Sequence, residues 1–303
     1  MRLLVITARH PLPEQPAAGA FVRRRLDDPG LTATVVAPRT LRSPAWRRYL
    51  DLLWRGLTAR GRFDGVEGHF VLPSGVVALL VARIRRLPLV MVAHGSDVGG
   101  MTRRPLMRSL ARRVVRGADL VVANSDETRA AVRRLGADAT VIPPGVEIDR
   151  FTATPRAPGG RRRVLYLGGA DPAKGHDVAT RLADTLLGPG LTVVDPDEIP
   201  GLLAEHDVLL MPSHAEAFGL AAAEAIAAGR WVVAADVGGL RSVVTHGVNG
   251  TLVRDGDYAG ALARVPDYDP QAVAATAARF DVTAQRRGMA AAWADLLTRK
   301  VRR

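Results

Sequence analysis

Residues 207–236 read DVLLMPSHAEAFGLAAAEAIAAGRWVVAAD, and this stretch decides the fold of the chain. The apolar run at its start predicts a β-strand, the alanine-rich segment between Gly219 and Gly229 predicts a helix, and RWVVAA predicts a second strand. A strand, a helix and a strand in this order are typical of a parallel sheet with helices packed on it. The loop before the helix is therefore expected at the carboxyl edge of the sheet, where such folds bind ligands.

The same alternation continues in both directions along the chain. Apolar runs predict strands at RLLVITA (2–8), ATVVAP (33–38), LPLVMVAHG (87–95), ADLVVANS (118–125), ATVIPPG (139–145), RRVLYLGG (162–169), LTVV (191–194), DVLLMPS (207–213), RWVVAA (230–235) and GTLV (250–253). A stretch rich in Pro and Gly, 142–160, predicts a linker. We expect an α/β protein with two Rossmann-like parallel-sheet domains, residues 1–150 and 151–284, and an interdomain cleft.

The last segment, residues 285–303, is expected to form a closing helix that packs across both domains. Its apolar residues recur at helical spacing, at Met289, Ala292, Trp293, Leu296 and Leu297.

Composition narrows the class of protein. The 303 residues are 48% hydrophobic and 24% charged, which indicates a globular protein and not a disordered one. The absence of cysteine excludes disulfides, thiolate nucleophiles and cysteine metal sites, and fits a cytoplasmic protein. The start of the chain reads as a strand and not as a signal peptide, and no apolar run is long enough to cross a bilayer.

Charge is distributed unevenly. The net charge of +12 comes from residues 1–150, which hold 25 arginines and 13 acidic residues. Such a basic half can attract a phosphorylated acceptor, an anionic membrane surface or nucleic acid, and it is equally typical of a solvated arginine-rich face.

Two glutamates lie in the loop and the helix of the stretch 207–236. Free backbone amides at a helix N-terminus suit a diphosphate, and here Phe218, Gly219 and Leu220 would supply them. Glu216 precedes the helix and Glu224 lies about one turn into it, so two carboxylates are placed to accept hydrogen bonds from sugar and ribose hydroxyls. Each of these residues also has an ordinary interpretation as a surface glutamate.

The segment PSHAEAFGLAAAEAIAAG (212–229) resembles the signature of the retaining family 4 glycosyltransferases of the GT-B fold. The resemblance extends to EGHFVLPSGVVALLVARIRRLPLVMVAHGSDV (67–98), NSDETRAAVRRLGADATVIPPGVEIDRF (124–151) and YLGGADPAKG (166–175). It implies transfer of a hexosyl unit from a nucleoside diphosphate sugar to a hydroxyl acceptor, either a secondary metabolite, a glycolipid or another small molecule, without a metal or other cofactor. The Arg-, Ala- and Val-rich composition suggests a bacterial source with such a biosynthetic role.

The resemblance also implies roles for single residues. Glu224 would bind the ribose, Glu216 the donor-sugar hydroxyls near the reacting carbon, and Lys174 the diphosphate leaving group. Composition supports Lys174 independently, because the chain has 40 arginines and only one other lysine, Lys300. His94 would lie beside the donor sugar, where it orients the sugar and stabilises charge.

Further residues match the family pattern less closely. Gly19, Gly168 and Gly169 would lie near the donor phosphates. On the acceptor side the pattern indicates Ser96, Asp97, Asn124 and Ser125, although Asp97 could equally cap the following turn.

Two features depart from the family pattern. Gly169 stands where the family commonly has an arginine on the diphosphate, and Arg161, Arg162, Arg163 or Arg241 are candidates to replace it. The stretch 175–215 is short, so that the usual turn beside the base is absent or reduced to GPGLTVVDPDEIP (188–200). The sequence therefore leaves open a weakly active or noncatalytic member, and it identifies neither donor sugar and base, nor acceptor, nor oligomeric state.

Two other readings stay open. A sugar-nucleotide epimerase would need the same nucleotide pocket with groups for elimination chemistry. A basic peripheral membrane-binding module, at the inner face of the membrane, would use residues 42–62, in which aromatic residues alternate with arginines: Trp46, Tyr49 and Trp54 with Arg47, Arg48 and Arg55. No nucleic-acid-binding motif accompanies these residues.

Overall fold

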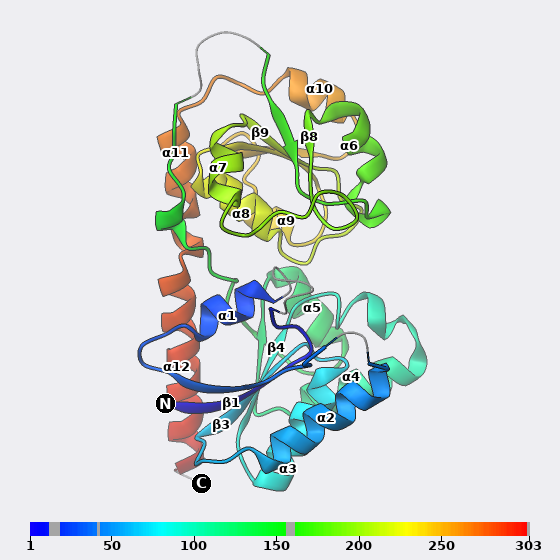
Figure 1. Ribbon diagram of the computed structural model, residues 1–303, viewed down its shortest axis with the longest axis vertical. Coiled ribbons are helices and arrows are strands. Elements are labelled where there is room, and N and C mark those ends of the chain that lie inside the picture. Colours follow the sequence, from blue (N-terminus) through cyan, green and yellow to red (C-terminus); the bar gives the residue numbers. More distant parts are fainter. Residues whose placement is uncertain (12–18, 41–42, 156–160, 302–303) are drawn as a thin grey trace. The chain divides into compact units, whose positions relative to one another are not determined.

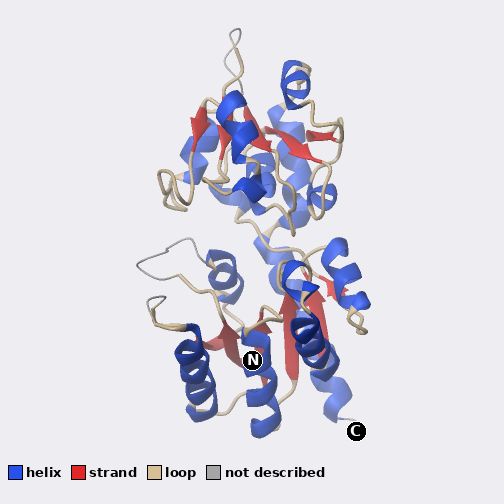
Figure 2. Ribbon diagram, turned by 90° about the vertical axis from the view of Figure 1, so that its right-hand side faces the viewer, coloured by secondary structure: helices blue, strands red, loops and turns tan. Residues whose placement is uncertain are grey.

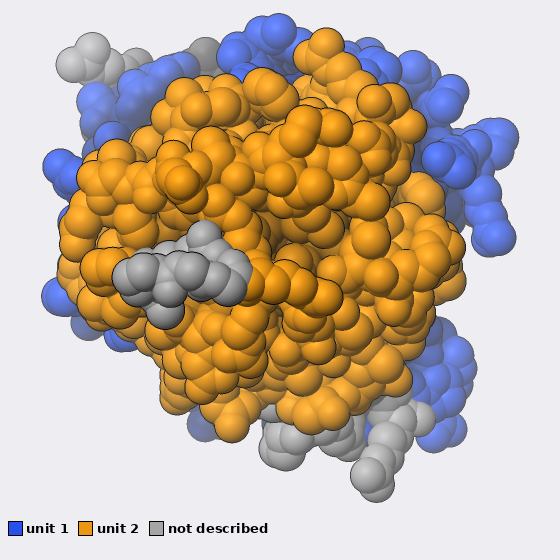
Figure 3. All heavy atoms as spheres, turned by 90° about the horizontal axis from the view of Figure 1, so that it is seen from above, with its two compact units in different colours: residues 1–145, 283–303 blue, residues 146–282 orange. Residues whose placement is uncertain are grey.

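The computed structural model describes residues 1–11, 19–40, 43–155 and 161–301. The chain forms two compact units, residues 1–145 with 283–303 and residues 146–282, coloured separately in Figure 3. Each unit is an α/β structure with its own parallel sheet, as the sequence predicts. In the described part of the chain no helix is both long and apolar enough to span a membrane.

The sheet of the first unit has six parallel strands in the order β2-β1-β3-β4-β5-β6. Its strands are β1 (Arg2–Thr7), β2 (Thr32–Val36), β3 (Gly65–His69), β4 (Leu89–Ala93), β5 (Leu120–Ala123) and β6 (Thr140–Val141). The strand order reverses between β1 and β3, since Leu3 pairs with Ala33 on one side and with Gly65 on the other. A parallel sheet binds ligands at the carboxyl edge beside such a reversal.

Helices cover both faces of this sheet, as Figures 1 and 2 show. They are α1 (Ala20–Leu26), α2 (Ala45–Thr58), α3 (Ser74–Arg85), α4 (Pro105–Gly117), α5 (Asp126–Arg134) and α12 (Val282–Val301). Successive residues of β1 enter opposite cores, because side chains alternate along a strand. Leu4 and Ile6 pack with residues of α2 to α5, and Leu3 and Val5 pack with α12.

The C-terminal helix α12 packs on the sheet of the first unit (Figure 1). Met289, Trp293 and Leu296 lie on one side of the helix and are buried against that sheet. The helical spacing predicted this helix, which begins at Val282. Its packing across both domains stays a prediction.

The sheet of the second unit has five parallel strands in the order β11-β10-β9-β7-β8. Its strands are β7 (Val164–Tyr166), β8 (Thr185–Leu186), β9 (Val208–Met211), β10 (Trp231–Ala235) and β11 (Gly250–Val253). Its helices are α6 (His176–Leu182), α7 (Ile199–Ala204), α8 (Leu220–Ala227), α9 (Leu240–Val243), α10 (Tyr258–Ala263) and α11 (Pro270–Ala275). Here the strand order reverses between β7 and β9.

Three strand assignments differ from the sequence prediction, namely the run LTVV and the strands β8 and β3. The run LTVV at 191–194 forms no strand, and Val193 is exposed; the position beside β7 is taken by β8, which comes earlier in the chain. Strand β3, GVEGH, was not predicted, because a sequence with two glycines, a glutamate and a histidine does not resemble a buried strand. Its five residues are nevertheless all buried.

Candidate functional site

A cavity of about 230 Å³ opens in the second unit at the carboxyl ends of β7 and β9, where the strand order reverses. Its lining includes predicted donor-site residues from three separate segments, namely Gly168, Lys174, Glu216 and Leu220. The remaining lining residues are Tyr166, Leu167, Leu209, Leu210, Met211, Ser213 and Ala221. The fold thus brings together residues that are far apart in the sequence.

Lys174 and Glu216 form an ion pair at this cavity, with 2.6 Å between the ammonium Nζ and the carboxylate Oε2. Lys174 ends a short 3₁₀ turn, Pro172–Lys174, in which the side chain of Asp171 accepts a hydrogen bond from the amide of Ala173. Gly175 then turns the chain with a positive φ, and a Cβ there would lie 2.1 Å from the carbonyl oxygen of Pro212. The glycine therefore lets the lysine turn approach the loop that carries Glu216.

Helix α8 begins beside this ion pair. The first amides of any helix lack intrahelical acceptors, and the N-cap here, Gly219 with φ of 97°, has no side chain that could cap them. Leu220 and Ala221, the first two helical residues, line the cavity. A diphosphate is the kind of ligand that such amides and the helix dipole favour.

Phe218 and Glu224, also predicted at this site, are both buried. The ring of Phe218 packs edge-on against Phe280, so its side chain belongs to the core of the unit. Glu224 lies one turn inside α8 and is not among the residues that line the cavity. The ribose contact assigned to Glu224 stays a prediction.

The two departures from the family pattern are physically linked. Gly169 has φ of 68°, and a Cβ there would lie 2.3 Å from the carbonyl oxygen of Pro189. The turn at 187–190 packs directly on Gly169, whose amide donates to Leu187, while the amide of Ala170 donates to Pro189. The short connection after α6 thus occupies the space that a side chain at position 169 would need.

None of the arginines considered as replacements is among the residues that line the cavity. Residues 161–163 precede β7, at the opposite end of the strand from the cavity. Arg161 pairs with Asp184, and Arg162 bonds to the carbonyl groups of Val265 and Pro266. Arg241 pairs with Asp236 at 2.6 Å.

In the first unit His94 follows β4 at the carboxyl edge of the sheet. Its ring stacks near His69, with centroids 5.4 Å apart, and contacts Phe70 at 4.3 Å and Phe21 at 5.0 Å. Phe70 has φ of 68°, a strained conformation for a residue with a side chain. Burial, His69 and the nearby Arg9 lower the pKa of His94 well below its usual value, so the imidazole is neutral.

The predicted acceptor-side residues mostly support the backbone around His94. Asp97 is buried and accepts hydrogen bonds from the amides of His94, at 3.0 Å, and of Val71, at 2.6 Å. Burial raises the pKa of Asp97 to about 6, although these amides oppose the rise. Asn124 donates to the carbonyl oxygen of His94 at 3.1 Å.

The other predicted residues of this unit have local roles. Ser125 caps α5 by accepting from the amide of Thr128, and Ser96 is exposed. Gly19 precedes α1 with φ of 74°, and a Cβ there would lie 2.5 Å from the carbonyl oxygen of Arg9. The loop before it, 12–18, lies outside the described residues, as does Arg42, the first residue of the predicted membrane segment.

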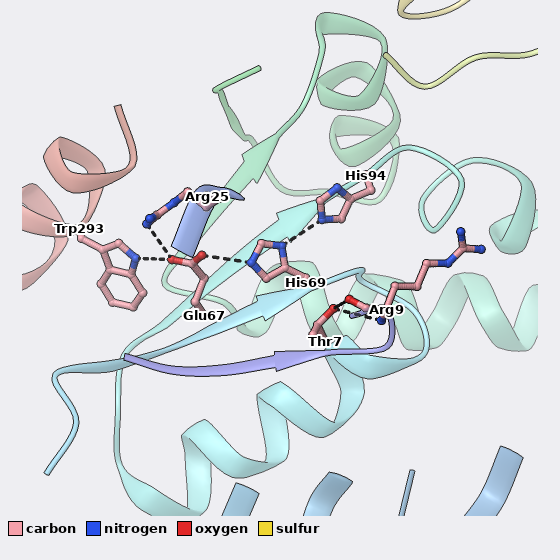
Figure 4. A network of polar contacts seen from close by, with 7 residues as sticks. All are labelled: Thr7, Arg9, Arg25, Glu67, His69, His94 and Trp293. Carbon is pink, nitrogen blue, oxygen red and sulfur yellow. Dashed lines mark hydrogen bonds and ion pairs between the residues drawn. The ribbon is translucent and has the colours of Figure 1, made fainter. Parts of the chain in front are cut away.

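Sequence analysis missed two residues that contact this site, Glu67 and His69 (Figure 4). Both lie on β3 and face the same side, because they are two residues apart on a strand. His69 bonds to Glu67 through Nε2, at 3.1 Å, and to Nε2 of His94 through Nδ1, also at 3.1 Å. A strand assignment for GVEGH would have revealed this alignment.

The acidic side chains of the Asp-X-Asp triplets make local contacts. The chain contains three Asp-X-Asp triplets, at 195–197, 255–257 and 267–269. Their carboxylates cap turns and helices or pair with arginines, as Asp257 and Asp269 do at α10 and α11. In the described ranges no three His, Asp or Glu side chains are grouped to hold an ion.

Comparison with protein families assigns both halves of the chain. Residues 2–150 match the model of Glycosyltransferase Family 4, and residues 156–265 match that of Glycosyl transferases group 1. The match to D-inositol 3-phosphate glycosyltransferase of Geodermatophilus obscurus has 36% identity over 68% of this chain and 60% of that protein. The match to the enzyme of the same name from Thermobispora bispora has 31% identity over 79% of this chain and 72% of that protein.

Solved structures with the same fold cover nearly the whole chain. Anabaena Alr3699/HepE in complex with UDP and glucose gives a TM-score of 0.74 at 20% identity, over 97% of this chain and all of that one. Sucrose-phosphate synthase from Thermosynechococcus elongatus gives 0.75 at 18% identity, over 98% and 99% of the two chains. The chain spans about three fifths of the length of several curated relatives. On its two parallel-sheet units of the GT-B class and these sequence matches, the chain belongs to glycosyltransferase family 4.

Proposed function

We propose that the protein transfers a sugar, with retention of anomeric configuration, from a nucleoside diphosphate sugar to a hydroxyl of a small-molecule or lipid-linked acceptor. The observation that carries the proposal is the Lys174–Glu216 pair beside the start of α8, in a cavity at the carboxyl edge of the second sheet. Family membership favours transfer over epimerisation as the reaction of this site.

The arrangement suits a diphosphate leaving group. Lys174 has three N–H donors, so it can keep one hydrogen bond to Glu216 and direct others to phosphate oxygens. The free amides of α8 add donors where negative charge develops. Glu216 accepts from sugar hydroxyls close to the reacting carbon, and it is only partly exposed, which strengthens such bonds.

The reaction proceeds on one face of the sugar. The bond between the anomeric carbon and the diphosphate oxygen breaks, a short-lived oxocarbenium ion forms, and the acceptor oxygen attacks from the side just vacated. The acceptor proton leaves with the diphosphate. Neutral His94 orients the sugar through a hydrogen bond, and no metal ion takes part in the proposed reaction.

A ligand screen tests the donor site. UDP, GDP, dTDP and their common sugar conjugates are added to the protein, and the melting temperature is measured, because a ligand that binds the folded state raises it. We expect one base to stabilise the protein. No shift with any of these nucleotides at millimolar concentration would overturn the donor-site assignment.

The acceptor is the least defined partner. Several relatives are named D-inositol 3-phosphate glycosyltransferase, and the basic first half of this chain can attract an anionic acceptor. Phosphorylated polyols are therefore the first acceptors to test, with release of the nucleoside diphosphate as the assay. Mg²⁺ and EDTA should give equal rates if the reaction needs no metal.

One observation favours a second property, peripheral attachment of a cytoplasmic enzyme to the inner face of the membrane. Trp46, Leu50 and Trp54 recur every fourth residue on α2 and are all exposed, while Arg47 stacks on Trp46. Exposed aromatic residues among arginines are typical of helices that lie on anionic lipid.

Liposome flotation tests this attachment. Vesicles with anionic lipid should carry the protein upward, and Trp46→Ala with Trp54→Ala should abolish flotation. The double variant Val193→Ala, Val248→Ala removes exposed apolar residues of the second unit and is the matched control. Equal flotation of both double variants would contradict the assignment to α2.

A further inference from the structure

Glu67 is a fully buried carboxylate in a central strand of the first sheet. It accepts hydrogen bonds from Arg25 at 3.3 Å, from His69 Nε2 at 3.1 Å and from Trp293 Nε1 at 2.9 Å (Figure 4). Burial alone would raise the pKa of Glu67, but Arg25 and the hydrogen bonds from His69 and Trp293 lower it to about 2. At neutral pH this carboxylate is ionised, so it accepts hydrogen bonds and donates none.

The backbone of β3 is shaped to admit these partners. A Cβ on Gly65 would lie 2.4 Å from the Trp293 ring, and a Cβ on Gly68 would lie 2.6 Å from Met91. The glycines on either side of Glu67 thus make room for the tryptophan of α12 and for the packing of the neighbouring strand. The glycines and the polar residues of β3 made this strand hard to predict. The same residues form the network or make room for it.

Stability alone explains this network poorly. Desolvation offsets much of the attraction in a buried ion pair, and apolar residues of similar size often stabilise a protein as well or better. Arg25 also leaves its Nε and Nη1 atoms buried without a hydrogen-bond partner. An apolar core in the same place would be about as stable, so packing alone does not account for these buried charges.

The order of donors and acceptors follows from the ionised carboxylate. We take His69 as the neutral imidazole, whose one ring proton lies on Nε2 and is donated in the hydrogen bond to Glu67. Its Nδ1 is then a bare acceptor, so the 3.1 Å contact to His94 requires a proton on His94 Nε2. A neutral His94 with that proton has an unprotonated Nδ1, and no described residue donates to it.

We propose that Glu67 and His69, held by Arg25 and Trp293, are positioning residues that fix His94 as its Nε2–H tautomer and so make Nδ1 a permanent acceptor for a substrate hydroxyl. Phe21 and Phe70 hold the same ring in place through their contacts. In this state His94 orients the sugar without donating a proton. The inference rests on the proposed function for its substrate, whereas the tautomer itself is independent of it.

Nitrogen-15 NMR of the histidine-labelled full chain tests the tautomer, because protonated and bare ring nitrogens have well-separated shifts. The His94 signals are assigned by their loss in His94→Gln. We expect His94 in the unmodified protein to show a protonated Nε2 and a bare Nδ1. A protonated Nδ1 would overturn the proposal, and this measurement needs neither a variant of the network nor a substrate.

Two substitutions at position 69 separate positioning from packing. His69→Phe keeps a ring to stack on His94 and removes the acceptor, whereas His69→Asn restores an acceptor near the position of Nδ1. We expect mixed His94 tautomers in His69→Phe and the single Nε2–H tautomer in His69→Asn. An unchanged His94 tautomer in a folded His69→Phe variant would refute the positioning role of His69.

Transfer kinetics then link the tautomer to the site. In His69→Phe we expect kcat to fall on the order of 10-fold, the factor of about one hydrogen bond, with KM little changed. His69→Asn should regain most of that loss. If neither the unmodified protein nor any variant transferred sugar, the proposed function would fail. The NMR experiment would still decide whether Glu67 and His69 fix the His94 tautomer.

Discussion

Lys174 is one of two lysines in a chain with 40 arginines, and it is the one whose ammonium lies at the cavity of the second unit. A compact ammonium pairs with Glu216 at 2.6 Å, whereas the planar fork of an arginine would demand a different geometry. The choice of lysine at this position therefore has a physical reason beyond composition.

Replacing Lys174 with alanine should weaken binding of the stabilising nucleoside diphosphate roughly 10- to 100-fold, because a hydrogen bond to a charged group contributes about 1.5–3 kcal/mol. Titration calorimetry measures the change. Lys300→Ala is the matched control, since the ammonium of Lys300 pairs with Asp119 in the first unit. Equal affinities of the two variants would remove Lys174 from the donor site.

Glu216→Gln should reduce the transfer rate on the order of 100-fold, since a charged acceptor of the sugar hydroxyls becomes a neutral one. Binding of the free diphosphate should persist, because Lys174 loses a competing partner. Initial rates of nucleotide release measure the effect. Glu205→Gln, an exposed glutamate of the same unit, should transfer at the unmodified rate.

Glu67 makes a prediction about pH. Its pKa falls from 4.5 to about 2 on folding, so its contribution to stability is complete above pH 4.5 and is lost as pH falls toward 2. The shift corresponds to about 3 kcal/mol. Denaturant unfolding at pH 5 should show Glu67→Gln to be less stable by about 3–5 kcal/mol, the loss expected for a broken buried pair, with a smaller gap at pH 3. A gap independent of pH would show that the carboxylate is not ionised.

At the scale of elements, one turn explains both departures from the family pattern, the glycine at 169 and the short stretch 175–215. The turn after β8 packs on Gly169, so the short connection and the missing arginine form one structural change. Comparison with the family pattern position by position counts the missing arginine and the short connection as two separate changes. In the structure a side chain at 169 and the turn at 187–190 exclude each other.

Restoring the arginine alone should therefore fail. Gly169→Arg is expected to lower stability by at least about 1–2 kcal/mol, because a side chain is unfavourable at a positive φ and the Pro189 carbonyl fills the space. Nucleotide affinity should not rise. Thermal melting and calorimetry check both points, with Gly201→Ala as control, since a Cβ there meets no atom within 4 Å. A stable variant with tighter binding would contradict the packing argument.

At the scale of the whole molecule, two units have separate cores, and the last helix of the chain belongs to the first unit. Trp293 is fully buried there, against the glycine-flanked strand that carries Glu67. Among the described residues, those that line the cavity at Lys174 all belong to the second unit. Stability of the first unit and nucleotide binding can therefore be changed separately.

Trp293→Ala should destabilise the first unit by about 3–5 kcal/mol, the usual cost of removing a large buried aromatic side chain. Nucleotide affinity should stay within a few-fold of its value in the unmodified protein below the unfolding transition. Trp54→Ala, at an exposed tryptophan, should change stability little. A large loss of nucleotide affinity in folded Trp293→Ala would show that the units are energetically coupled.

Sequence patterns determined much of this protein. Hydrophobic runs predicted the positions of nine strands, and the alanine-rich segment after Gly219 predicted helix α8. The scarcity of lysine singled out Lys174, which lies at the cavity beside that helix. These features are local, because strand burial, helix capping and residue choice act over a few neighbouring residues. Family membership, now shown by comparison, could be inferred from the same segments.

Only the tertiary structure decided the rest. Strand β3 forms because its neighbours β1 and β4 bury it, and Trp293, more than 200 residues away, fills the space beside Gly65. The same long-range packing joins Glu67 and His69 to His94 and sets Pro189 against Gly169. The stretch 207–236 thus contains the start of α8 and Glu216. The lysine of the ion pair, Lys174, comes from another loop, and the order of strands in the sheet brings the two residues together.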